Sequence, residues 1–370
     1  MRVLIDAHMV GERETGNETY TVNLIAALQR LEADDLWVAT PRPEAVTECL
    51  HVGRRTTLLR LSSSSWQRLG WELAALAARY RVDVVHTTYA GPLFCSRPVV
   101  TTIHDVSFRS HPEWFSLRDR LVLELGVRLS ARRARQIITV SHFSKAEILR
   151  FYPQAAGRLS VTHEAAAPGF TPASRQTEEA DRAQLARLGV TRPYVLAVGN
   201  LQPRKNLPRL LEAFRLLILA QADRNARLVI AGQNAHRAAE VYATMAALQL
   251  NAKVRFVGYV SEPALVALYR GAELYCHPAS YEGFGLPVLE AMACGTPVVA
   301  ANTSSIPEIA GDAARLVNPF DPHAIMLAIA ELLADPSRRE ELRRRGLERA
   351  ASFSWDQTAA ATHAVYERCR

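Results

Sequence analysis

The sequence of 370 residues lacks several features that would assign a chain quickly to one class of protein. No apolar run reaches the roughly 20 residues of a membrane-spanning helix, and the first residues, MRVLIDAH, are typical of a strand rather than of a signal peptide. The five cysteines form no C-x-x-C pair and no Cys/His zinc pattern, which favours a reduced, cytoplasmic setting. No G-x-G-x-x-G fingerprint opens the chain, so an NAD site has little support.

The sequence also has little excess charge. The formal net charge is +7, with an excess of +4 up to position 170 and +3 beyond it. Because no basic arm is present, we expect no nucleic-acid partner, and the charge supports at most a mild preference for anionic substrates or anionic lipid surfaces.

Short apolar strands alternate with helical segments in both halves of the chain. This alternation is typical of parallel sheets covered by helices, so we predict an α/β fold with two doubly wound, Rossmann-like domains that face a cleft. The predicted parts are an N-terminal domain, a polar linker, a C-terminal domain and a final helix. Their bounds are 1–170, 171–190, 191–352 and 353–370.

Residues 278–297, PASYEGFGLPVLEAMACGTP, predict a loop, a helix from about Pro287 to Cys294 and a buried strand. Gly283 and Gly285 allow a tight turn, and the N-terminus of the helix favours an anion. Glu282 lies before this helix and Glu290 one turn inside it. Two carboxylates beside an anion site need other ligands, and sugar or ribose hydroxyls fit them.

Arg204 and Lys205 follow the strand predicted at 194–200 and precede a helix with Pro208 near its start. Cations at a helix N-terminus are disfavoured by the helix dipole unless an anion is bound. A diphosphate suits both side chains, because Arg binds as a fork and Lys as a point charge.

In the first half, His86 and His104 fall at the carboxyl ends of predicted strands, where ligands bind in such sheets. A capping or packing role is the favoured interpretation of His86. The His104–Asp105 pair could bind a substrate hydroxyl or hold a proton. Thr15 and Glu18 fit a capping box that starts a helix after Gly16, and this stretch is either a phosphate loop or an ordinary strand–helix connection.

The stretch 118–135 carries six arginines beside a leucine-rich face. It predicts either a surface helix with solvated arginines or a basic amphipathic helix that contacts an anionic membrane. The second alternative would place the protein at the inner face of the membrane.

Taken together, these motifs resemble those of the retaining glycosyltransferases of family 4, which have the GT-B fold. The resemblance is densest from PRKN (203–206) through FVGYV (256–260) and the E-x7-E of Glu282 and Glu290 to SSIPEIAGDAA (304–314). Weaker matches are TGNETY (15–20), TIHD (102–105) and TVSHFSK (139–145). One departure is in the first loop, where the family often has Gly-x-Gly and this chain has Gly16 and Asn17.

The resemblance implies that the first domain binds an acceptor and the second a nucleotide-sugar donor. It assigns the diphosphate to Arg204 and Lys205, the donor sugar to Glu282 and the ribose to Glu290. It places His104 near the reacting carbon. The remaining donor-binding residues that it implies are Gly16, Asn17, Gly258, Tyr259, Val260, Gly283, Phe284, Gly285 and Leu286.

No D-x-D motif is present, so we expect Arg204 and Lys205 to supply the positive charge and no metal or other cofactor to be required. The segment 304–314 resembles mannosyltransferases that use GDP-mannose, which we prefer over a UDP-sugar; the expected acceptor is a saccharide or lipid-linked saccharide of the cell envelope. A nucleotide-sugar epimerase of GT-B fold and a non-catalytic nucleotide-sugar-binding protein remain as alternatives. A phosphorylase fits poorly, because none of the three lysines sits in an evident cofactor pocket.

Overall fold

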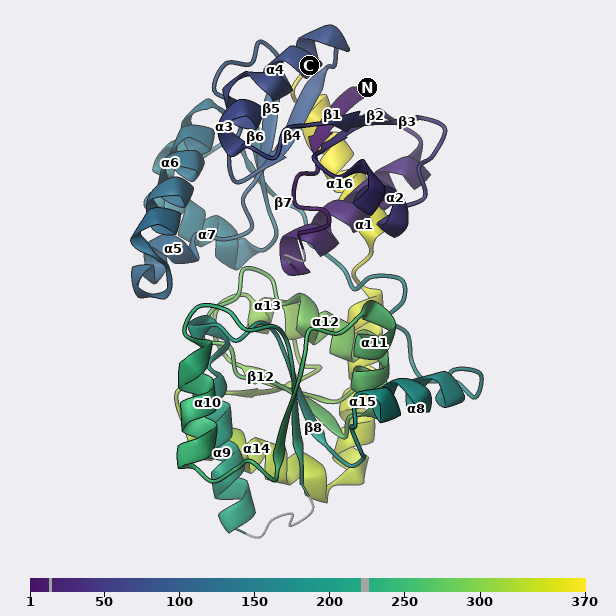
Figure 1. The fold of residues 1–370 in the computed structure, drawn as a ribbon, viewed down its shortest axis with the longest axis vertical. Coiled ribbons are helices and arrows are strands. Elements are labelled where there is room, and N and C mark those ends of the chain that lie inside the picture. The colour runs from purple at the N-terminus through teal and green to yellow at the C-terminus, as the bar shows by residue number, and fades with distance from the viewer. Residues whose placement is uncertain (13–14, 221–225) are drawn as a thin grey trace. The chain divides into compact units, whose positions relative to one another are not determined.

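The computed structural model describes residues 1–12, 15–220 and 226–370, and these form two compact units. Unit 1 contains Met1–Ala165 and Ser354–Arg370, and unit 2 contains Ala166–Phe353. Each unit is built on one parallel sheet, of seven strands in unit 1 and six in unit 2 among the described residues (Figure 1). The predicted α/β class with two Rossmann-like sheets is therefore confirmed.

The sheet of unit 1 has the order β3-β2-β1-β4-β5-β6-β7. Its strands are β1 Arg2–Asp6, β2 Asp35–Thr40, β3 Thr56–Arg60, β4 Val84–Thr88, β5 Val99–Thr102, β6 Gln136–Thr139 and β7 Leu159–Val161. Its longer helices are α1 Thr15–Leu31, α2 Pro43–Cys49, α4 Leu73–Arg79, α6 Leu117–Arg133, α7 His142–Phe151 and α16 Trp355–Glu367. The short helical segments are α3 Ser65–Gln67, the π-helical turn Arg68–Glu72 and α5 Ser107–Ser110, with 3-10 turns at Pro112–Trp114 and Pro153–Ala155.

The sheet of unit 2 has the order β10-β9-β8-β11-β12-β13. Its strands are β8 Val195–Val198, β9 Leu228–Ala231, β10 Val254–Gly258, β11 Leu274–His277, β12 Val298–Ala301 and β13 Arg315–Val317. Its helices are α8 Glu178–Arg187, α9 Leu207–Leu219, α10 Ala238–Ala247, α11 Glu262–Gly271, α12 Leu286–Ala293, α13 Ile306–Ala310, α14 Pro322–Ala334 and α15 Pro336–Ala351, and a 3-10 turn spans Pro203–Lys205.

The central strands are buried on both faces, as parallel strands covered by helices must be. Every residue of β9, β11 and β12 is buried, which explains their unbroken apolar sequences. The strands that the sequence did not reveal, β3, β7 and β13, all lie at or near sheet edges. They are short and partly exposed, so their apolar signal is weak.

The C-terminal helix α16 packs on α1 within unit 1 (Figure 1). Trp355 at its start and Tyr366 near its end are both buried. The Trp355 ring lies edge-on to Tyr20 of α1, with 6.1 Å between the ring centroids. This packing follows from the small residues between the two aromatics, which let the helices approach closely.

Two local expectations differ from the structure. Helix α1 begins at Thr15, so Gly16 lies in its first turn; the side chain of Thr15 is outside the described part. The Glu18 carboxylate accepts a hydrogen bond from the Gly11 N–H, at 2.7 Å. Within 171–190, residues Glu178–Arg187 form helix α8, which packs on α11. Its sequence has few apolar residues, so tertiary packing and not local pattern stabilises it.

Among the described residues, no helix combines the length and the apolar composition needed to cross a bilayer.

Candidate active site

The basic turn of unit 2 connects β8 to α9. Arg204 and Lys205 lie in the 3-10 turn and precede α9, as the sequence predicted. Asn206 between them and the helix has a left-handed backbone, with φ 55°. Its amide donates to the carbonyls of Pro278 and Pro319, at 3.0 and 2.6 Å. Asn206 thereby fixes the basic turn to the loop that carries Glu282.

Both basic side chains point at Glu282. Arg204 Nη1 lies 2.6 Å from Glu282 Oε2, and Lys205 Nζ lies 2.6 Å from Glu282 Oε1. The side chains of Lys205 and Glu282 are only 9% and 8% exposed, so this cluster is largely desolvated. Two cations against one carboxylate leave a net positive charge, which suits an anionic ligand.

Burial and charge act in opposite directions on this cluster. Burial raises the pKa of Glu282, but Arg204, Lys205 and His277 together hold that pKa well below its usual range. Burial lowers the pKa of Lys205, and the Glu282 carboxylate partly offsets this shift. The carboxylate is therefore ionised near neutral pH, and its charge is what supports a buried ammonium.

His277 completes the cluster, and sequence analysis missed it. It ends strand β11, is 2% exposed, and places Nε2 3.3 Å from Glu282 Oε1. The hydroxyl of Tyr275 lies 2.7 Å from His277 Nδ1. Burial lowers the pKa of His277, with Glu282 partly opposing the shift. This neutral imidazole lies between the Tyr275 phenol and the Glu282 oxygen that also contacts Lys205.

Glu290 lies in α12 and is 8% exposed. Tyr269 of α11 donates a hydrogen bond to Glu290 Oε2 at 3.0 Å. The rings of Tyr269 and Tyr275 pack edge to face, with centroids 5.4 Å apart. One buried tyrosine pair therefore supports both glutamates of the E-x7-E motif, Glu290 directly and Glu282 through His277.

The glycine loop before α12 is held by two serines. Ser305 Oγ donates to the carbonyls of Glu282 and Phe284 at 2.9 and 2.7 Å, and the Glu282 N–H donates to Ser304 Oγ at 3.0 Å. Gly285 is the N-cap of α12, with φ 109°. A Cβ there would lie 2.6 Å from Ile306 Cδ1, so both conformation and space require glycine.

The other predicted loop residues lie at the same helix start. Gly283, Phe284 and Leu286 are buried around the turn. The N-terminal amides of α12 follow them. The predicted turn and helix start are therefore present, and anion binding by these amides stays a prediction.

A row of glycines links the end of β10 to Lys205. The Gly232 N–H donates to the Gly258 carbonyl at 2.8 Å, and a Cβ on Gly232 would lie 2.1 Å from the Gly199 oxygen. A Cβ on Gly199 would in turn lie 2.8 Å from Lys205 Cε. Tyr259, 51% exposed, and the half-buried Val260 follow Gly258. Gly258, Tyr259 and Val260 therefore lie at the same carboxyl edge of the sheet as Lys205.

His104 of unit 1 is placed by Glu164 and two tyrosines. His104 is 8% exposed, and its Nδ1 lies 3.1 Å from Glu164 Oε1. The rings of Tyr20 and Tyr89 lie 4.7 and 5.8 Å from it, between centroids. His104 Nε2 is buried without a hydrogen-bond partner among the described residues. Asp105, which the sequence paired with His104, instead accepts hydrogen bonds from Ser107.

A polar network lies beneath His104. The hydroxyl of Thr102 is 2.9 Å from Tyr20 Oη and 2.8 Å from His86 Nε2, and His86 Nδ1 is 2.6 Å from Tyr366 Oη. Burial lowers the pKa of His86 to about 3, so this imidazole is neutral. His86 therefore has a structural role, joining α16 to the sheet.

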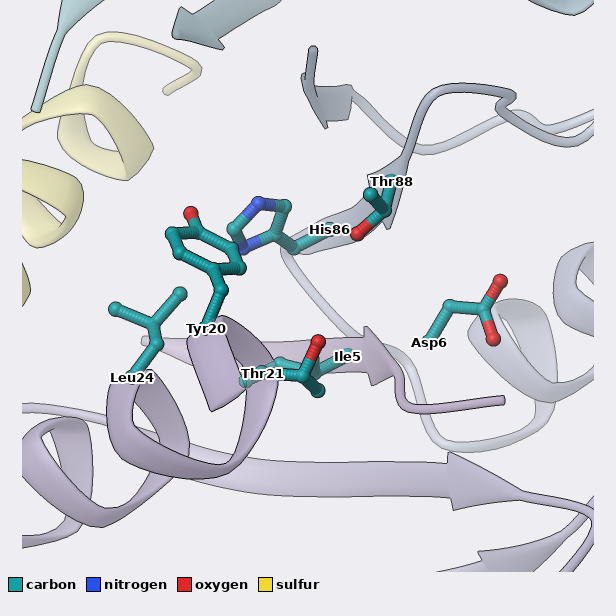
Figure 2. Close-up of a pocket in the computed structure, with 7 residues that line it drawn as sticks. All are labelled: Ile5, Asp6, Tyr20, Thr21, Leu24, His86 and Thr88. Carbon is teal, nitrogen blue, oxygen red and sulfur yellow. The ribbon is translucent and has the colours of Figure 1, made fainter. Parts of the chain in front are cut away.

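Figure 2 shows a small cavity beside this network. It is lined by Ile5, Asp6, Tyr20, Thr21, Leu24, His86 and Thr88. The cavity volume of about 10 Å³ is near the minimum that holds one water molecule and far below what a sugar needs.

The predicted phosphate-contacting residues of unit 1 lie in the first turn of α1. Gly16 is exposed, and a Cβ built on it would have no atom within 4 Å. Asn17 is half-buried.

Two family profiles match this chain. "Glycosyltransferase Family 4" matches residues 15–166, and "Glycosyl transferases group 1" matches residues 178–349. The two matches are adjacent and together cover most of both units.

Among related proteins, O-antigen chain mannosyltransferase B of Escherichia coli is 36% identical over 271 residues, which cover 72% of this chain and 70% of that protein. The D-inositol 3-phosphate glycosyltransferase of Corynebacterium glutamicum is 32% identical over 230 residues, 60% of this chain and 54% of that protein. Among solved structures, Anabaena Alr3699/HepE in complex with UDP and glucose has a TM-score of 0.76 at 20% identity and covers 98% of both chains. At this identity the structural match shows the fold alone.

Proposed function

This chain belongs to glycosyltransferase family 4, whose members are retaining hexosyltransferases, and we propose that it transfers mannose from GDP-mannose without a metal ion. The proposed acceptor is a saccharide or lipid-linked saccharide in the synthesis of a cell-envelope polysaccharide or glycolipid. The observation that carries the proposal is the buried Arg204–Lys205–Glu282 cluster, whose excess positive charge lies at the carboxyl edge of the unit 2 sheet.

The diphosphate of the donor is the ligand that this cluster fits. Arg204 and Lys205 provide a fork and a point charge, and the N–H groups at the start of α12 provide a second set of donors. These groups stabilise the negative charge that develops on the leaving nucleotide. Removing one such contact typically reduces the rate about 10²–10³-fold, and in this proposal the two basic side chains supply the charge that a metal ion would otherwise supply.

The two glutamates of the motif then have separate roles in the proposal. Glu290, held by Tyr269, accepts hydrogen bonds from the ribose hydroxyls. Glu282 accepts hydrogen bonds from the sugar hydroxyls, and the diphosphate competes with it for Arg204 and Lys205. Residues 258–260 contact the base, and Gly16 with Asn17 approaches the phosphate from unit 1.

His104 has an unpartnered Nε2 and is proposed to contact the donor sugar near its reacting carbon. In the reaction, the bond between the anomeric carbon and the diphosphate oxygen breaks. The acceptor oxygen forms its bond to that carbon on the same face, and its proton passes to the departing phosphate. This front-face course retains the anomeric configuration and needs no carboxylate nucleophile.

Mannose is favoured by the relatives. O-antigen chain mannosyltransferase B is 36% identical over 72% of this chain, and a 113-residue segment is 43% identical to the MMP alpha-(1->4)-mannosyltransferase of Mycolicibacterium hassiacum. A UDP-sugar donor is the second candidate, because the Anabaena structure holds UDP and glucose. Neither an epimerase nor a non-catalytic binding protein has a comparable relative among them.

A ligand screen by thermal unfolding tests the donor directly. GDP, UDP, ADP and their sugar adducts are added to the full chain, and a ligand at 100 times its dissociation constant should add about 2.7 kcal/mol of stability. GDP and GDP-mannose are expected to raise the melting temperature most. A larger shift with UDP and UDP-glucose would replace GDP-mannose by the second candidate, and binding without turnover on any acceptor would favour a non-catalytic protein.

A further inference from the structure

The helix α6 presents an apolar surface that the core of unit 1 does not use. Leu117, Leu121, Val122 and Leu125 are 70%, 59%, 65% and 56% exposed. The core side of the same helix is formed by Val127, Ser130 and Ala131, which are all buried. The helix lies at the edge of unit 1, beside α5 (Figure 1). Exposed apolar side chains clustered in this way mark an interaction surface.

Arginines continue the same face of the helix. Leu117, Leu121 and Leu125 follow one another at spacings of four, and Arg128 and Arg132 extend that row by three and four more residues. Both arginines are exposed, and neither has a carboxylate partner among the described residues. The face is therefore apolar in its N-terminal half and basic in its C-terminal half.

The acidic residues of α6 do not offset this charge. The Asp119 carboxylate accepts a hydrogen bond from the Ser116 hydroxyl at the start of the helix, at 2.6 Å. Glu124 lies 3.3 Å from Arg109 and accepts from Tyr152. Arg118 and Arg120, both exposed, flank the leucines. Apolar side chains surrounded by unpaired arginines fit an anionic lipid surface, where leucine enters the acyl region and arginine reaches the phosphates.

An aromatic side chain extends the surface. The Arg133 guanidinium donates to the Leu93 carbonyl at 3.2 Å, and the Leu93 N–H donates to Leu69 in the π-helical turn. The next residue, Phe94, is 78% exposed. Trp71 of the π-helical turn is 60% exposed. Aromatic side chains at this boundary are typical of interfacial membrane contacts.

The orientation of α6 relates this surface to the candidate site in unit 1. Strands β5 and β6 are parallel neighbours, so α6 between them runs from the carboxyl edge of the sheet to its amino edge. The Arg135 N–H donates to the Val99 carbonyl at 2.8 Å, which places the basic end of α6 at the start of β5. The leucine half therefore lies at the carboxyl edge, on which His104 also lies.

We propose that the face of α6 formed by Leu117, Leu121, Val122, Leu125, Arg128 and Arg132 docks unit 1 on an anionic bilayer. A second copy of the chain is a poorer occupant, because a two-fold contact through this face would bury its arginines against leucines or against other arginines, without carboxylate partners from the same face. The link to a lipid-linked acceptor rests on the proposed function, but the docking itself does not. Docking would hold the acceptor-binding edge of unit 1 at the membrane surface.

Sedimentation of the full chain with lipid vesicles tests the proposal. We expect binding to vesicles of phosphatidylglycerol and phosphatidylcholine in equal parts, weakened by added salt, and little binding to phosphatidylcholine alone. The double variant Leu121→Gln, Leu125→Gln should bind about 100-fold more weakly, at about tenfold per leucine. The double variant Arg128→Gln, Arg132→Gln should lose about 25-fold, at roughly fivefold per arginine.

Matched controls lie on unit 2. Leu327 of α14 is 60% exposed, as Leu121 is, and Leu327→Gln should not change vesicle binding. Arg175→Gln with Arg187→Gln removes two exposed charges outside α6 and should also leave binding unchanged. The melting shift with GDP is measured on the same preparations, and the α6 variants should retain it. A donor that fails to bind while docking persists would overturn only the proposed function.

Three results would overturn the docking proposal. The first is a wild-type chain that does not sediment with anionic vesicles or sediments equally with neutral ones. The second is an equal loss in the α6 variants and their controls. The third is a wild-type dimer that the leucine variant converts to a monomer without any lipid effect, which would assign the face to a second copy.

Discussion

Replacing Glu282 by Gln separates the two effects that this carboxylate has on the basic turn. The substitution keeps the shape of the side chain but removes the charge that faces Lys205 and Arg204, both 2.6 Å away. Removing one partner of a buried ion pair costs about 3–5 kcal/mol. Gln can still accept a hydrogen bond, so we expect the lower end, about 3 kcal/mol, which for a unit of this size is about 6–12 °C in melting temperature.

The same change should strengthen binding of the product nucleotide. In the wild-type chain Glu282 competes with a diphosphate for both cations. Without that competition GDP should bind about tenfold more tightly, equivalent to about 1.4 kcal/mol. Transfer of the sugar should fall, because the carboxylate that contacts the sugar in the proposed mechanism is lost.

The pH dependence provides an internal check. Burial lowers the pKa of Lys205, and Glu282 opposes this shift, so in Glu282→Gln the pKa falls further. At pH values between this lowered pKa and about 10.4, Lys205 is protonated in the unfolded chain but not in the folded chain. The free energy of unfolding therefore rises with pH across that range. The destabilisation of Glu282→Gln should therefore be larger at pH 6 than at pH 9.

Calorimetric melting and titration of GDP measure both effects. The control is Glu331→Gln, which breaks the half-exposed pair with Arg315 at 3.0 Å and should cost no more than about 1 kcal/mol. A Glu282→Gln variant that is as stable as the wild type, or that binds GDP more weakly, would refute the competition between carboxylate and diphosphate.

Three further predictions address other parts of the molecule. Tyr269→Phe removes a hydrogen bond to the Glu290 carboxylate and should raise the donor KM roughly tenfold with kcat little changed; the exposed Tyr242→Phe is its control, and an unchanged KM would argue against the ribose role. The pKa of His86 is about 3 when folded and about 6.5 when unfolded, so stability is full above pH 6.5 and falls by about 2 kcal/mol on acidification to pH 5. His86→Asn should remove that loss in denaturant titrations, and an equal loss in both proteins would contradict the assignment. Transfer activity should survive a chelator such as EDTA, and a complete loss restored by magnesium would show that Arg204 and Lys205 do not replace a metal.

The sequence predicted the parts of the site that depend on local pattern. The Gly283–Gly285 turn, the helix that follows it and the position of Glu290 in its first turns agree with α12 to within one residue. These features depend on glycine, proline and apolar spacing, which are readable over short windows. The α/β class follows in the same way from the alternating apolar runs.

The contacts between distant segments were beyond that reasoning. Glu164 lies 60 residues after His104, and Tyr366 lies 280 residues after His86, so their pairing depends on how β7 and α16 are placed. His277 was the exception that the sequence could have revealed. It ends a buried strand, which is the same position that pointed to His86 and His104.

The pairing of Arg204 and Lys205 with Glu282 changes what the basic turn means. From the sequence, two cations beside a helix start suggested a bound anion, because the helix dipole disfavours positive charge there unless negative charge opposes it. The structure shows that an internal carboxylate already opposes it, 77 residues after Lys205. The turn is therefore stable without a donor, and the site does not need a ligand in order to fold. One carboxylate neutralises the two cations only in part. A ligand therefore gains binding energy from the cluster only if it brings further negative charge. A diphosphate does this, whereas a neutral sugar does not, so the nucleotide part of the donor should supply most of the binding energy in unit 2 and the sugar most of the selectivity.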